Sequence, residues 1–98
     1  MSTPQMIRAF FILMDQDRLD ERLENLLNRM LLKSYIEEDK LKLLFKNDIL
    51  AEISHSFDGF KLKLSDPSFY DSGDSENKLI SDDRIRYYLK SLANYKYQ

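Results

Sequence analysis

Apolar and polar residues alternate on both sides of Asp58-Gly59. Alternation at period two is typical of a β-strand that buries one face. An Asp-Gly dipeptide is typical of tight hairpin turns, because Asp tolerates and Gly readily adopts the positive φ that such turns require. The pattern therefore predicts a β-hairpin with strands at about 50–57 and 60–65.

A turn centred on Asp58-Gly59 fixes the register of this hairpin. The expected pairs on its apolar face are Phe57 with Phe60, His55 with Leu62, and Ile53 with Leu64. The expected polar face carries Ser54, Ser56, Lys61 and Lys63. A lone hairpin is only marginally stable in water, so we expect the rest of the chain to cover the apolar face.

Apolar residues at steps of three and four predict two helices before the hairpin. The clearer one spans 17–35, where leucine and methionine recur at this spacing and acidic residues precede basic ones. A second amphipathic segment over 37–47 would place Leu41, Leu44 and Phe45 on one face. We predict that it is also helical and ends before the hairpin.

Residues 4–14 fit two interpretations. In a helix, Pro4 would occupy the first position, where a missing N–H costs nothing. A buried strand over 7–14 is the rival, because this run is rich in Phe and Ile. We favour the helix, and we expect a kink or turn near 15–17 because the apolar phase breaks there.

The segment 66–77 is the most loop-like part of the chain. It is rich in Asp, Ser and Gly and contains no basic residue. We predict an acidic, flexible and exposed loop. Beyond it, Ser81 or Asp82 can cap a last helix that extends to about Tyr95.

Length and charge restrict the class of protein. At 98 residues the chain is expected to form a single domain over 1–98. Its net charge of −2 gives no general attraction to nucleic acid or anionic lipid. The absence of cysteine excludes disulfides and thiolate metal sites. The apolar run 10–14 is too short to span a bilayer, so we expect a small acidic protein, cytoplasmic and without membrane association.

No residue pattern indicates catalysis. His55 is the only histidine, and its place among apolar residues predicts a half-buried structural role. The acidic clusters are typical of helix starts and solvated surfaces. The two glycines, at 59 and 73, are too far apart to form a phosphate-binding loop. We therefore predict a non-enzymatic protein with no cofactor and no metal.

These elements predict an α+β fold: a mostly helical small domain with a central hairpin and a C-terminal helix. We expect a protein–protein interaction module (a subunit, adaptor or inhibitor) that binds a protein partner or forms a homo-oligomer, because open strand edges and exposed aromatic residues favour association. The candidate interface residues are Lys61, Lys63, Arg84, Arg86, Tyr87, Tyr88 and Tyr95.

The alternative is a winged-helix-like nucleic-acid-binding regulator. Three helices followed by a hairpin is the element order of that fold, and Lys61 and Lys63 would lie on the outer face of the wing together with Ser54 and Ser56. The three acidic residues that begin the segment 37–47 count against this alternative, because a recognition helix must approach phosphates there.

Overall fold

The computed structural model of the chain describes residues 3–13 and 19–95. The elements, in order, are α1 (Thr3–Leu13), α2 (Glu21–Met30), β1 (Leu31–Glu37), β2 (Lys40–Phe45), β3 (Leu50–Ser56), β4 (Gly59–Leu64), the short 3-10 helix η1 (Pro67–Phe69) and α3 (Asp82–Asn94). The predicted α+β class is confirmed. The prediction of a mostly helical domain is wrong, because the strands contribute a sheet comparable in extent to the helices.

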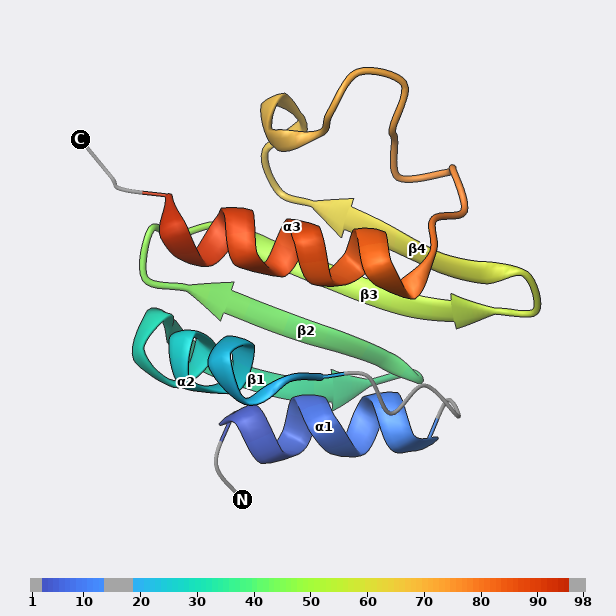
Figure 1. Cartoon of the computed structure of the whole chain (residues 1–98). Coiled ribbons are helices and arrows are strands. Elements are labelled where there is room, and N and C mark those ends of the chain that lie inside the picture. Colours follow the sequence, from blue (N-terminus) through green and yellow to red (C-terminus); the bar gives the residue numbers. More distant parts are fainter. Residues whose placement is uncertain (1–2, 14–18, 96–98) are drawn as a thin grey trace.

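The strands form one antiparallel sheet in the order β1-β2-β3-β4, and the helices lie against one of its faces (Figure 1). Alternate side chains of β2, β3 and β4 point into this layer and are buried. The inward residues of these strands are Leu41, Leu43, Phe45, Ala51, Ile53, Phe60, Leu62 and Leu64. The helices therefore cover the apolar face of the predicted hairpin, as expected.

The predicted helix over 37–47 is wrong, and its place is taken by a hairpin of β1 and β2. Glu38 and Asp39 both have positive φ, 54° and 63°, which is the backbone conformation of a tight two-residue turn. Leu41 and Leu43 alternate with lysines at period two, so one face of β2 is apolar. The predicted helix over 17–35 is accordingly shorter, because the chain is already extended from Leu31 onward.

This correction removes the structural basis of the winged-helix alternative. Only two helices precede the strands among the described residues, and the segment expected to be a recognition helix lies within the sheet. The favoured helical interpretation of residues 4–14 is confirmed by α1. The kink expected near 15–17 lies outside the described residues.

The predicted hairpin is present as β3 and β4, but its register differs from the expectation. Ser56 pairs with Gly59, so Phe57 and Asp58 form the two-residue loop. His55 consequently pairs with Phe60, and the pairs expected from a turn at Asp58-Gly59 are each shifted by two residues. A shift of two preserves both faces of the strands, which is why Ile53, Phe60, Leu62 and Leu64 are still inward as predicted.

The shifted turn changes the surroundings of two residues. Phe57 was expected on the covered apolar face, but at the tip of the loop it is 98% exposed. His55 was expected to be half-buried, but it is exposed and its ring lies edge-on to Phe60 at 5.2 Å between centroids.

A close backbone contact explains why Gly59 is at the start of β4 rather than inside the turn. Ile80 forms an isolated β-bridge with Phe60, with both N–H···O distances at 2.8 Å. A Cβ atom on Gly59 would lie 2.7 Å from the Ile80 carbonyl oxygen. The backbone φ of Gly59 is also +153°, a value that residues other than glycine rarely adopt. The glycine is therefore required by a contact with a residue distant in the sequence.

We expect Gly59→Ala to lower the free energy of unfolding by about 2–3 kcal/mol, because the new methyl group would clash with Ile80 and strain the backbone. Gly73→Ala is the matched control: Gly73 has a φ of +88° but nothing within 4 Å of an added Cβ. Urea denaturation of both variants separates the clash from the backbone strain. Equal losses for the two variants would contradict the role given to Ile80.

Candidate interaction surface

The face of the sheet that the helices leave uncovered is the main exposed feature of the molecule. We call it the open sheet face. It consists of the outward residues of all strands, which are Lys33, Tyr35, Glu37, Lys40, Lys42, Leu44, Leu50, Glu52, Ser54, Ser56, Lys61 and Lys63. Strand alternation places them together, because every second residue of a strand points to the same side.

Lysines dominate the charge of the open sheet face. Lys42 lies 3.0 Å from Glu37 and 3.9 Å from Glu52, and Lys40 lies 3.4 Å from Glu52. The hydrogen bond from Lys42 to Glu37 raises the pKa of the Lys42 ammonium. These two acids are balanced by Lys40 and Lys42, so the remaining lysines give the face a positive charge although the whole chain carries −2.

The remaining lysines of this face form no ion pair in the described part of the chain, although Glu52 is the cross-strand neighbour of Lys63. Within residues 3–13 and 19–95, Lys61 and Lys63 make no ion pair, and Lys33 contacts only the ring of Tyr35, at 5.4 Å from its centroid. A hollow of about 150 Å³ on the open sheet face lies beside Lys61 and Lys63. Its lining residues are Lys40, Glu52, Ser54, Lys61, Lys63 and Glu76.

The open sheet face also has an apolar part. Leu44 and Leu50 are paired on neighbouring strands and are both half-buried. Tyr35 is likewise half-buried on the edge strand β1. Apolar and aromatic side chains surrounded by charged ones are typical of surfaces that bind other proteins.

The seven predicted interface residues do not form one surface. Lys61 and Lys63 lie on the open sheet face, as the sequence predicted for the polar side of the hairpin. The other predicted residues belong to α3 or directly follow it, and α3 packs on the opposite face of the sheet (Figure 1). The prediction therefore combined residues from two sides of the molecule.

The predicted residues around α3 are largely engaged within the chain. Tyr88 is buried, and Arg86 is paired with Asp82 and Asp83. Tyr87 is 45% exposed, and Tyr95 is 43% exposed with its ring at 4.8 Å from Phe69 in an edge-on contact. Of these residues, only the two exposed tyrosines present an aromatic surface to solvent.

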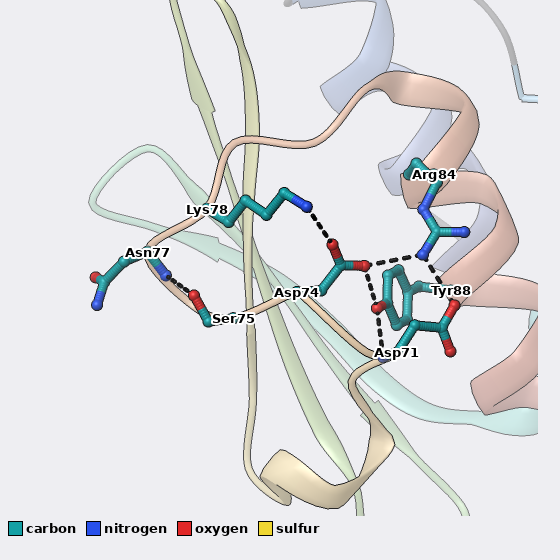
Figure 2. A network of polar contacts seen from close by, with 7 residues as sticks. All are labelled: Asp71, Asp74, Ser75, Asn77, Lys78, Arg84 and Tyr88. Atoms are coloured by element: carbon teal, nitrogen blue, oxygen red, sulfur yellow. Dashed lines mark hydrogen bonds and ion pairs between the residues drawn. The ribbon is translucent and has the colours of Figure 1, made fainter.

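Arg84 and Tyr88 belong to a polar network that ties the acidic segment 66–77 to α3 (Figure 2). Arg84 donates to one oxygen of Asp74 at 2.8 Å and to Asp71 at 2.8 Å. The Tyr88 hydroxyl donates to the same oxygen of Asp74 at 2.6 Å and accepts from the Asp71 N–H at 2.8 Å. Lys78 approaches the other oxygen of Asp74 at 3.2 Å.

The network shifts the pKa values of its central groups. The hydrogen bonds from Tyr88 and Arg84 lower the pKa of Asp74 to about 2. Desolvation and the bond to Asp74 raise the pKa of Tyr88 to about 12. The ionised Asp74 carboxylate accepts the hydrogen bond that the protonated Tyr88 hydroxyl donates, so each group stabilises the protonation state in which the other can form this bond. These bonds therefore hold the segment 66–77 against α3. The flexibility predicted for this segment stays a prediction.

We expect Asp74→Asn to lower the free energy of unfolding by about 2 kcal/mol at neutral pH. The folded-state pKa of Asp74 lies below its ordinary 3.8, so its contribution is present above that pH and disappears as the pH falls toward about 2. Urea denaturation at several pH values should therefore show a weaker acid dependence in the variant. Glu76→Gln, in the same segment but exposed, is the control and should change little. An unchanged acid dependence in Asp74→Asn would contradict this role.

Across the described ranges, no group of three or more His, Cys, Asp or Glu side chains could hold a metal ion. None of the helices in that part of the chain is long and apolar enough to cross a membrane.

The lysines of β1 and β2 on the open sheet face were not predicted from the sequence. Residues 37–47 were predicted to form a helix, in which Lys40 and Lys42 would not share a face with Lys61 and Lys63. The signal was present in the strict alternation of lysine and leucine over 40–43.

Comparison of the chain with known protein families, with curated proteins and with solved structures found no match.

Proposed function

We propose that this chain is a non-enzymatic protein–protein interaction module that binds an acidic segment of a partner protein on the open sheet face. The observation that carries this proposal is the charge of that face. Lys61 and Lys63 project from it without ion pairs in the described part of the chain, although acidic residues exceed basic ones overall. Complementary charge is a major determinant of partner choice and of association rate.

The chemistry of the face supports a protein partner over a nucleic acid. Leu44, Leu50 and Tyr35 offer apolar area that a protein segment can bury, whereas a phosphate backbone cannot. An acidic protein segment can instead place its carboxylates between the lysines and an apolar side chain over the leucine pair.

The charge-reversed variant Lys61→Glu/Lys63→Glu tests this proposal. Labelled poly-glutamate is a suitable probe, and its binding can be followed by fluorescence anisotropy at low and moderate salt. We expect the wild-type chain to bind the probe and the variant to bind at least about tenfold more weakly, because attraction becomes repulsion. Binding by the wild-type chain should also weaken as salt increases.

Arg29→Glu/Lys90→Glu is the matched control, because it makes the same change in net charge at exposed positions on helices α2 and α3. We expect it to keep most of the affinity. Equal losses in the two variants would show that net charge alone governs binding and would contradict a specific face. Tighter binding to duplex or single-stranded DNA than to poly-glutamate would favour a nucleic-acid function instead.

A further inference from the structure

The two edges of the sheet differ. Most of the outward backbone groups of β4 are bonded within the chain: Ile80 bridges Phe60, while the Tyr70 hydroxyl donates to the Leu62 carbonyl at 2.6 Å and accepts from the Leu64 N–H at 3.0 Å. At the opposite edge, β1 has only β2 as a neighbouring strand, and no described residue pairs with its outer side, although α1 contacts β1. An open strand edge is a template for pairing with another chain.

The tight turn determines which backbone groups of β1 are directed outward. A two-residue turn at Glu38-Asp39 makes Glu37 and Lys40 a hydrogen-bonded pair. Because hydrogen-bonded and non-hydrogen-bonded pairs alternate in an antiparallel ladder, Tyr35 and Lys33 also bond to β2. The N–H and C=O groups of Ser34 and Ile36 consequently point away from the sheet.

The same rule can be checked on the other edge of the sheet. Ser56 and Gly59 close the two-residue loop between β3 and β4, so the rule places the backbone groups of Phe60, Leu62 and Leu64 outward. These are the residues whose backbone groups bond to Ile80 and to the Tyr70 hydroxyl. The rule therefore gives the correct outward groups for β4, which supports its use for β1.

The regular part of β1 is self-complementary. A bulge between Leu31 and Lys33 and the turn at Glu38 limit the regular segment to residues 33–37, with Tyr35 at its centre. Two antiparallel copies aligned on that centre would place each Ser34 opposite Ile36 of the other copy, which joins the outward backbone groups. The same alignment places Lys33 opposite Glu37 of the other copy, a favourable cross-strand pair of opposite charges.

Exposed apolar side chains gather on the elements at this edge. Four of the large exposed hydrophobic residues belong to α1 and β1, and Leu13 is 72% exposed. These residues are Ile12, Leu13, Leu32 and Ile36. The two elements are in contact, so pairing of β1 would bring this apolar surface of one copy near that of the other.

We propose that two copies of this chain pair antiparallel through the outer edge of β1, with the two-fold axis at Tyr35. The two four-stranded sheets then become one continuous sheet. Lys33 of each copy pairs with Glu37 of the other, and the two Tyr35 rings meet beside the axis. This inference does not rest on binding of an acidic partner, because it uses the strand edge rather than Lys61 and Lys63.

The mass of the wild-type chain in solution is the first test. Sedimentation velocity over a wide concentration range should show a species of twice the 11.7 kDa chain mass that dissociates on dilution. Lys61→Glu/Lys63→Glu should dimerise like the wild type, which separates this test from that of the proposed function. A strict monomer at every concentration would overturn the proposal.

Cysteine cross-linking tests the position of the axis. The chain has no cysteine, so a single introduced cysteine gives an unambiguous product. Tyr35 would form a non-hydrogen-bonded pair with its own copy, with Cα atoms about 4.5 Å apart, which is within the range of a disulfide. We expect oxidised Tyr35→Cys to form a covalent dimer much faster than Ser54→Cys, which lies on β3. Equal rates would overturn the proposed axis.

Charge reversal tests the register. Lys33→Glu alone should weaken dimerisation about tenfold, because two attractive pairs become repulsive. Glu37→Lys alone should have a similar effect. The double variant Lys33→Glu/Glu37→Lys restores opposite charges across the interface and should recover affinity to within about threefold of the wild type. If the dimerisation affinity of the double variant falls by the product of the two single-variant factors, this register is wrong.

Discussion

The strict alternation of inward and outward side chains in the sheet is the constraint on which the other features of this molecule depend. Three helices cover one face, so the inward residues of β2, β3 and β4 are apolar and buried, except for the exposed His55 near the end of β3. The intervening side chains point to the open sheet face, where they need not fit into a core, and several of them are lysines. The positive character of the open sheet face thus follows from the same periodicity that builds the core, even though the chain as a whole is acidic.

The segment between β4 and α3 completes the fold through polar contacts rather than through a core of its own. Tyr70 and Ile80 satisfy backbone groups of β4, and Tyr88 and Arg84 hold the carboxylate of Asp74, which is 7% exposed. A buried carboxylate requires such partners, since an unpaired charge away from water is costly. Arg84 and Tyr88, two of the residues that the sequence offered for binding, therefore fix this segment to α3.

The sequence predicted the elements whose signals are local. The apolar alternation around residue 58, the cap at Ser81 and the helical face of residues 4–14 were sufficient for β3, β4, α3 and α1. The register was missed because the position of Gly59 depends on contact with Ile80, which no local pattern reveals. Residues 37–47 were misassigned because Leu41 and Phe45 fit both a helical and a strand period. For the same reason, only the lysines of β4 could be placed on the candidate surface.

The contacts of Tyr70 and Ile80 have a consequence for assembly. A sheet with two open edges can accept a copy at each side, and repetition of that step gives an unlimited filament. Here the chain occupies one of its own edges, so a copy added at β1 finds no second edge on which growth could continue. If two copies pair through β1 as proposed, the contacts of Ile80 and Tyr70 with β4 leave no comparable free edge on the far side, so pairing through the sheet ends at two copies.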